Sequence, residues 1–360
     1  MLGENKLMKI LVVLTGGTFS SINSKKGLST STTNENFLKD KIQHEIPFDV
    51  NIKMVQPFSK LSENIDDNDW NNIINCLREN IKPDINGVII IHGTDTMAYT
   101  SSTLAYFEEF SKKVPLICTG ANYSLYENGT DAIVNLVQSI ISLKKFNEQN
   151  IIGSFIVFNG RNDFKEKALI HMGTKVKKDI WEDTCYRSFY IGSHQIGYLE
   201  GKDKFSFDTK LYNKLFNKEV LYDIKSKFNV AEVVSYKIYP GFDPDNIKRD
   251  VDNGKKYFII EIYNSGTAPA KDTYLSLKEN VEYAIKNNCI VFAISQHEGH
   301  LGATMNLYES STILLNAGVI PLKNMIWEAS IPKLMIASAT FTKKNDIIKY
   351  MLDNIAGEIN

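Results

Sequence analysis

The sequence predicts an α/β protein of two domains: a larger N-terminal domain built on a mostly parallel sheet, and a smaller C-terminal α/β domain. Three observations lead to this prediction. Short β-branched runs alternate with amphipathic segments of helical length, which is typical of right-handed βαβ crossovers. The 360 residues suffice for two domains with a large core. A lysine-rich, polar stretch interrupts the alternation beyond the middle of the chain.

The predicted strands are short apolar runs, and the predicted helices are longer segments with one polar face. In chain order, the strands are expected at residues 10–14, 87–91, 115–119, 154–158, 230–238, 257–263 and 290–294. The helices are expected at residues 69–79, 101–111, 131–145, 271–287 and 308–316. The lysine-rich stretch at residues 201–229 is the predicted linker, which leaves residues 1–200 for the N-terminal domain and 230–360 for the C-terminal domain.

Charge and cysteine content exclude several classes of protein. The net charge is -1, from 41 basic and 42 acidic residues that are interspersed, so no basic face for nucleic acid is indicated. Cys76, Cys118, Cys185 and Cys289 are scattered, which indicates neither a disulfide framework nor a zinc site. No apolar run is long enough to span a membrane. We therefore expect a cytoplasmic protein with no metal, no membrane partner and no nucleic-acid partner.

Two threonine-rich loops follow predicted strands. Thr15-Gly16-Gly17-Thr18 ends the first strand, and His92-Gly93-Thr94-Asp95-Thr96 ends the strand at 87–91. Ligands of parallel α/β sheets bind at this carboxyl edge. A threonine hydroxyl attacks a carbonyl only with help from a base and from oriented N–H donors, which the second loop could supply. Each loop alone is equally consistent with a glycine turn or a helix cap. The polar residues 19–37 are predicted to form a flexible lid.

Both loops resemble the signature motifs of the L-asparaginase family of bacterial and archaeal amidohydrolases. The resemblance extends along the chain, to Ser62-Glu63-Asn64-Ile65 ahead of Trp70, Gly120-Ala121, GTKVKK at 173–178, Tyr239-Pro240-Gly241 and the runs at 265–269 and 317–334. The last run resembles cytoplasmic type I asparaginases and the asparaginase-like subunit of archaeal glutamyl-tRNA(Gln) amidotransferase. The resemblance implies a two-domain asparaginase-like fold and a cofactor-free enzyme that hydrolyses the side-chain amide of L-asparagine to aspartate and ammonia.

The resemblance also implies catalytic roles, residue by residue. Thr18 matches the threonine nucleophile that forms an acyl-enzyme. Thr94, Asp95 and Lys178 match a second set, in which the lysine, oriented by the aspartate, moves protons and activates water. Lys178 is chosen from the lysines of GTKVKK because this run aligns with the G-x-x-V-x-K of the family. His92 is expected to support its turn by hydrogen bonding.

The substrate-binding residues are implied in the same way. Asp95 matches the group that binds the substrate's α-ammonium, and Ser62, beside Glu63, matches the residue that holds the α-carboxylate. The Gly93 turn is expected to free backbone N–H groups at the site. Thr267 matches a family asparagine that approaches the site from the smaller domain, often across a subunit boundary, although a structural turn role fits equally well. A homodimer or homotetramer acting on a small-molecule amide is therefore expected.

Three positions depart from the family pattern. Leu28 stands where a tyrosine often assists the nucleophile, which leaves Tyr123 and Tyr126 as candidates for that role. Glu63 places an extra carboxylate beside Ser62. Asn122 begins a segment that lacks the arginine common after Gly-Ala. Two alternatives thus stay open: an asparaginase-fold amidase acting on a modified, peptidyl or tRNA-linked amide, and a non-catalytic amino-acid sensor.

Overall fold

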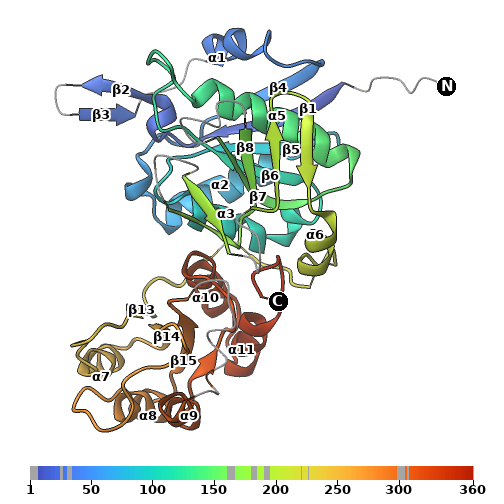
Figure 1. The fold of residues 1–360 in the computed structure, drawn as a ribbon. Helices are drawn as coiled ribbons and strands as arrows, with labels where there is room; N and C mark the ends of the chain where they lie inside the picture. The colour runs from blue at the N-terminus through green and yellow to red at the C-terminus, as the bar shows by residue number, and fades with distance from the viewer. Residues whose placement is uncertain are drawn as a thin grey trace. The chain divides into compact units, whose positions relative to one another are not determined.

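The chain folds into two compact units, each an α/β structure. The computed structural model describes residues 7–24, 27–30, 35–159, 167–179, 185–189, 195–219, 221–225, 227–297, 305 and 308–359. The first unit comprises Met1–Ser188 and Ser193–Ile224, and the second comprises Phe189–Gly192 and Lys225–Asn360. Figure 1 shows a large sheet in the first unit and a smaller one in the second. The predicted fold class is confirmed.

The sheet of the first unit has the strand order β12-β11-β8-β7-β6-β5-β1-β4 within the described residues. Strands β4, β1, β5, β6 and β7 are parallel, whereas β8, β11 and β12 are each antiparallel to their neighbours. The bounds are β1 Met8–Leu14, β4 Val50–Val55, β5 Gly87–Ile91, β6 Pro115–Thr119, β7 Gly153–Phe158, β8 Lys167–Met172, β11 Gly197–Glu200 and β12 Lys204–Phe207.

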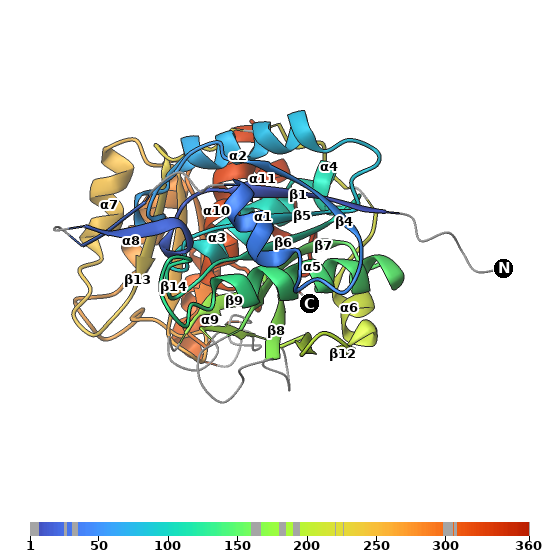
Figure 2. The same ribbon diagram turned by 90° about the horizontal axis from the view of Figure 1, so that it is seen from above.

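Helices cover both faces of this sheet, which is why its central strands are apolar throughout. β5 and β6 are buried at every position. Figure 2 shows α2 and α4 on one side of the strands and α5 on the other. The helices of this unit are α1 Glu35–Ile42, α2 Asp67–Asn80, α3 Met97–Tyr106, α4 Glu108–Ser111, α5 Ala132–Glu148 and α6 Thr209–Leu215. The helix expected at 101–111 is divided at Phe107 into α3 and α4.

The segment expected to be a linker, residues 201–229, contains β12 and α6, and the first unit continues to Ile224. β12 pairs with β11 at the edge of the sheet. Its alternating sequence, Lys-Phe-Ser-Phe, turns two rings to one face, where Phe205 and Phe207 lie 6.1 and 5.6 Å from the ring of Phe146. Lys204 and Ser206, two of the polar residues that suggested a linker, therefore form the exposed face of an edge strand.

The region predicted as a lid contains a two-stranded hairpin. β2 Ser21–Ser24 pairs antiparallel with β3 Gly27–Thr30, directly after the first threonine loop. Figure 1 shows this hairpin extending beyond the large sheet. The segment after Thr18 thus leaves the sheet edge as a regular ribbon.

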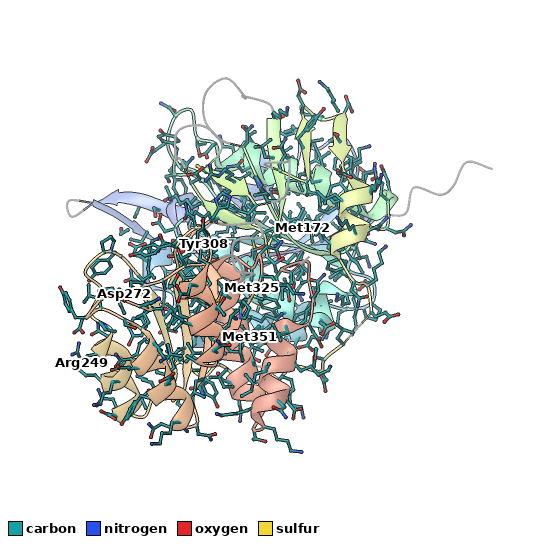
Figure 3. All side chains as sticks on the ribbon, turned by 60° about the horizontal axis from the view of Figure 1, so that its bottom comes forward. Met172, Arg249, Asp272, Tyr308, Met325 and Met351 are labelled. Carbon is teal, nitrogen blue, oxygen red and sulfur yellow. The ribbon has the colours of Figure 1, made fainter. Side chains whose placement is uncertain are left out.

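The second unit is a four-stranded parallel sheet in the order β13-β14-β15-β16, with helices α7 to α11. The bounds are β13 Val233–Lys237, α7 Asp245–Asp252, β14 Tyr257–Ile262, α8 Lys278–Lys286, β15 Ile290–Ser295, α9 Glu309–Asn316, β16 Ile320–Pro321, α10 Trp327–Thr340 and α11 Lys344–Leu352. Met325 and Met351, labelled in Figure 3, are buried in this unit. Among the described residues, no helix combines the length and apolar character needed to cross a membrane.

A fully buried ion pair ties α10 to the segment after α11. Lys333 and Glu358 both have 0% exposed side chains, and the lysine Nζ contacts the glutamate Oε1. Lys333 also donates to the carbonyl oxygen of Asp353 at 2.6 Å. The backbone N–H groups of Ile355 and Ala356 donate to the two Glu358 oxygens. Burial acts to raise the pKa of Glu358, but Lys333 and these N–H groups together hold it below its ordinary value.

Candidate active site

The first threonine loop is fixed between β5 and the segment that follows β4. Thr15 donates both its N–H and its Oγ1–H to the carbonyl oxygen of Ile91, at 3.0 and 2.9 Å. Gly17 N–H donates to the Lys60 oxygen at 2.8 Å, and Lys60 N–H donates to the Thr15 oxygen at 2.9 Å. The loop is therefore held on two sides by main-chain hydrogen bonds.

Glycines bring three loops into backbone contact. Gly17 has a φ of 72°, and a Cβ atom placed on it would lie 2.4 Å from Gly93 Cα. A Cβ atom on Gly93 would lie 2.6 Å from Ser62 Cβ. Both positions therefore exclude any side chain. Thr18, half-buried at the start of a 3-10 turn, and Thr94, which is buried, each follow one of these glycines and so belong to adjoining loops.

Lys178 joins the second threonine loop through its ammonium group. It lies at the end of β9, Val176–Lys178, and its Nζ donates to Thr94 Oγ1 at 2.9 Å and to Asp95 Oδ1 at 2.5 Å. The Lys178 side chain is 27% exposed and that of Asp95 is 60% exposed. The predicted trio of Thr94, Asp95 and Lys178 is thus brought together at the open edge of the site.

A short ribbon carries Lys178 to this loop. β9 pairs antiparallel with β10, Tyr186–Ser188, and places Tyr186 opposite Lys178. Tyr186 donates its hydroxyl to the carbonyl oxygen of Thr94 at 2.6 Å. Burial raises the pKa of this phenol well above its ordinary value of 10. Tyr186 was not predicted from the sequence, because a contact with a main-chain oxygen leaves no motif of residue types.

His92 supports its turn by hydrogen bonding, as the sequence analysis predicted, and it does so as a neutral side chain. Its Nδ1 lies 2.8 Å from the carbonyl oxygen of Gly93, which can only accept, so Nδ1 carries the proton. Its Nε2 then accepts from Thr100 Oγ1 at 2.9 Å, while Thr100 accepts from the Trp70 indole N–H at 3.0 Å. Burial lowers the pKa of His92 to about 4. The structural role is therefore confirmed.

The loop after β6 is bound to the first threonine loop. Asp131 accepts the backbone N–H groups of Asn122 and Tyr123, both at 2.9 Å, and this fixes the start of the loop. Leu125 N–H donates to the Phe19 oxygen at 3.0 Å, next to Thr18. Burial raises the pKa of Asp131, although the N–H donors act in the opposite direction. The loop after β6 and the first threonine loop are thus joined by a hydrogen bond at the carboxyl edge of the sheet.

Asn122, which departs from the family pattern, meets the ribbon that carries Lys178. Its Nδ2 donates to Cys185 Sγ at 3.0 Å. Cys185 precedes β10 with a positive φ of 57°, and burial raises the pKa of its thiol. The segment that lacks the family's arginine therefore begins with an uncharged amide packed against a neutral thiol.

The remaining predicted residues lie as follows. Ser62 is buried, and its carbonyl oxygen accepts from Thr96 Oγ1 at 2.8 Å, whereas Glu63 is exposed. Thr267 belongs to the second unit, where its carbonyl oxygen accepts from Tyr263 N–H at 2.9 Å in the turn after β14. The side chain of Leu28 lies outside the described residues.

The two candidate tyrosines belong to the loop after β6. Tyr126 stacks on Phe37 with ring centroids 5.7 Å apart and is 45% exposed, and Tyr123 is half-buried. Within the part of the chain that the structure describes, no group of three or more His, Cys, Asp or Glu side chains could hold a metal ion.

This two-unit fold, with threonine loops joined at the carboxyl edge of the large sheet, defines an asparaginase-type protein. Residues 9–196 match the family described as "Asparaginase, N-terminal", and residues 232–351 match "Glutaminase/Asparaginase C-terminal domain". The chain belongs to the asparaginase family, as its two loop motifs indicated.

Relatives and solved structures agree with this assignment. The chain is 30% identical to a glutamyl-tRNA(Gln) amidotransferase subunit from Methanococcus maripaludis, over 99% of this chain and 81% of that protein. It is 29% identical to the corresponding protein of Pyrococcus abyssi, over 99% and 78%. The thermostable L-asparaginase from Thermococcus kodakarensis has a TM-score of 0.78 at 25% identity, over 98% of this chain and 99% of that one. L-asparaginase I from Vibrio cholerae shares the fold, with a TM-score of 0.74 at 21% identity and coverages of 98% and 99%.

Proposed function

We propose that this protein hydrolyses the side-chain amide of L-asparagine to L-aspartate and ammonia through an acyl-enzyme on Thr18. One observation carries the proposal: Lys178 Nζ lies 2.9 Å from Thr94 Oγ1 and 2.5 Å from Asp95 Oδ1. Thr94 and Asp95 belong to the loop that contains Gly93. Gly93 in turn contacts Gly17, the residue before Thr18. A proton-moving group from β9 is thus hydrogen-bonded to the loop that adjoins the proposed nucleophile.

In the first half-reaction, the Thr18 hydroxyl oxygen attacks the amide carbon and the C–N bond breaks. The product is an ester on Thr18, and the hydroxyl proton passes to the leaving nitrogen, which departs as ammonia. Thr94 and Lys178 supply the path for that proton, since their hydrogen bond joins a hydroxyl to an ammonium group. Backbone N–H groups of the glycine turns are the candidate donors to the oxyanion.

In the second half-reaction, water attacks the ester carbon and the bond to Thr18 breaks. One water proton returns to the Thr18 oxygen through the same Thr94–Lys178 path, so the relay ends each half-reaction in the state in which it began. Asp95 orients Lys178 throughout, because a carboxylate at 2.5 Å fixes the direction of the ammonium group. The reaction then needs no cofactor.

The two charged ends of asparagine would be held by residues around the same loops. Asp95, 60% exposed, suits the α-ammonium, and Ser62, in contact with Gly93, suits the α-carboxylate. Glu63, exposed beside Ser62, is a further partner for the ammonium. The family resemblance adds Thr267 from the second unit of a neighbouring subunit, and with it a homodimer or homotetramer.

A second candidate is an amidase that acts on a tRNA-linked amide. It is favoured by the 30% identity to the glutamyl-tRNA(Gln) amidotransferase subunit from Methanococcus maripaludis, which spans 99% of this chain. Asn122 and Glu63, where the chain departs from the family pattern, favour a changed substrate over a changed reaction. The mechanism on Thr18 would be the same for either substrate.

Ammonia release distinguishes these functions. The purified protein and its Thr18→Ala variant should be assayed on L-asparagine, L-glutamine, D-asparagine and a peptidyl asparagine, with and without added glutamyl-tRNA(Gln). Turnover of L-asparagine alone that is lost in Thr18→Ala supports the proposal, and turnover that requires the tRNA supports the second candidate. Full ammonia release by Thr18→Ala would exclude Thr18 as the nucleophile. Calorimetric binding of asparagine without turnover would identify a sensor.

A further inference from the structure

Thr94 is held from two sides by one ribbon. On β9, Lys178 donates to the side-chain oxygen of Thr94 at 2.9 Å; on β10, Tyr186 donates to the main-chain oxygen of the same residue at 2.6 Å. The two donors are direct partners in the antiparallel register. The position of the Thr94 hydroxyl relative to Lys178 therefore depends on β10 as well, although β10 carries no proposed catalytic group. The Tyr186 hydroxyl of β10 holds the main chain of Thr94.

The Tyr186 hydroxyl adds something that the ring does not. The ring packs edge-on against Phe158, with centroids 5.3 Å apart, and phenylalanine would fill the same space. The hydroxyl instead satisfies a carbonyl oxygen in the loop that also holds Asp95. Because burial keeps the phenol protonated, this group remains a donor and does not itself carry protons.

The ribbon is also anchored at Cys185, the residue before β10. Cys185, directly before Tyr186, contacts Asn122 through its thiol, and its carbonyl oxygen accepts Asp179 N–H at 2.9 Å, just after Lys178. The segment that carries Lys178 is thus tied to the loop after β6 by Cys185 and to the second threonine loop by Tyr186. A three-residue strand gains a defined position from these two attachments.

We propose that Tyr186 is a positioning residue for the proton relay: its hydroxyl fixes the Thr94 main chain so that Thr94 Oγ1 and Asp95 stay aligned with Lys178 Nζ. This inference rests on the proposed amidohydrolase function. A hydrogen bond that aligns the relay affects the chemical step more than substrate binding, since no contact of Tyr186 with the substrate is involved.

The test compares Tyr186→Phe with Tyr212→Phe. Tyr212 is another buried tyrosine of the first unit, and its hydroxyl donates to the carbonyl oxygen of Ile152 at 2.8 Å. Ile152 directly precedes β7, so this contact lies at the amino ends of the parallel strands, away from the threonine loops. Tyr186→Phe should lower kcat for ammonia release by about tenfold or more with KM little changed, as expected for a small misplacement of a catalytic group. Tyr212→Phe should retain kcat. Equal kcat in the two variants, at equal folded fractions, would overturn the proposal.

A second readout requires no substrate. Acetic anhydride reacts with neutral amines, and peptide mass spectrometry can follow acetylation of Lys178 with Lys177 as an internal reference. Tyr186→Phe should raise the ratio of Lys178 to Lys177 acetylation about fivefold, by loosening a hydrogen bond of ordinary strength, and 4-aminophenylalanine at position 186, which restores a donor, should reverse the change. If the unaltered protein releases no ammonia from asparagine, the proposed function fails, and this ratio still decides the role of Tyr186. An unchanged ratio would contradict the positioning role.

Discussion

Gly17 and Gly93 contact each other backbone to backbone, since a Cβ atom on Gly17 would lie only 2.4 Å from Gly93 Cα. This contact sets the separation of the two threonine loops more closely than a side-chain contact could, because main-chain atoms cannot rotate away. The loop that binds Lys178 and the loop that contains Thr18 therefore meet at this glycine contact. A side chain at this boundary should therefore affect both the stability and the chemistry.

Gly17→Ala tests this boundary against a matched control. Gly17 and Gly129 have nearly equal φ values, 72° and 75°, but a Cβ atom on Gly129 would meet nothing within 4 Å. Backbone strain should cost each alanine variant about 1 kcal/mol of stability. Gly17→Ala should lose more than Gly129→Ala, because its methyl group also overlaps main-chain atoms of Gly93. Only Gly17→Ala should also lower kcat, by about 100-fold, because its methyl group forces the loops apart. Steady-state kinetics and urea unfolding measure both effects, and equal kcat values would contradict the interpretation.

Lys178→Met should remove the relay while leaving an apolar stem of similar length. We expect kcat to fall by about 10²- to 10⁴-fold, the range for losing a group that transfers protons. Lys177→Met, one residue earlier on the same strand, should keep kcat within about twofold, as is usual for substitutions outside a site. Ammonia release at saturating substrate compares the two variants. A comparable loss in both would mean that β9 acts only as a support.

The free energy of unfolding should decrease as the pH is lowered, and His92 should account for part of this decrease. The folded pKa is about 4, against an ordinary value of 6.5, so on acidification the unfolded chain takes up this proton before the folded chain does. The contribution of His92 is complete above pH 6.5 and is lost as the pH falls toward 4, at about 1.4 kcal/mol per pH unit within that window. Urea unfolding between pH 6.5 and 4 should show a shallower slope for His92→Gln by about that amount. Parallel slopes would show that the pKa of His92 is the same in the folded and unfolded chains.

Glu358→Gln should destabilise the second unit strongly. The change leaves the Lys333 ammonium, with a 0% exposed side chain, without its carboxylate. Breaking a buried pair in this way costs about 3–5 kcal/mol. Glu309→Gln is the control, because the Lys271–Glu309 pair has side chains 51% and 70% exposed, and it should cost less than about 1 kcal/mol. Chemical denaturation followed by fluorescence compares the two, and similar midpoints would show that the buried pair adds no net stability.

The parallel core of the fold was predictable because it depends on runs that are apolar at every position. β5 and β6 begin and end where the sequence indicated, since strands buried on both faces need no alternation. The edge strand β12 and its neighbour β11 were missed for the opposite reason. β11 and β12 bury one face only, and four alternating residues are too few to distinguish from a loop. α10 was also missed, as its interior Pro332 opposes a helix prediction.

The site was predictable where a motif fixes residue types. Thr94, Asp95 and Lys178 could be named from family resemblance and are in contact in the structure. Tyr186 could not be named, because it acts on a main-chain oxygen that every residue possesses. Asp131 is similar, since it accepts backbone N–H groups of Asn122 and Tyr123. Catalytic side chains leave a pattern in the sequence, whereas the supports that orient them often do not.

The buried Lys333–Glu358 pair also has a consequence for biosynthesis. Glu358 is translated 25 residues after Lys333, so α10 leaves the ribosome before its lysine has a carboxylate. A chain that stops ahead of Glu358 would have to bury an unpaired ammonium group or leave the helix undocked, and either outcome exposes apolar surface to proteases and chaperones. We therefore expect the second unit to reach its full stability only on a chain translated through Glu358.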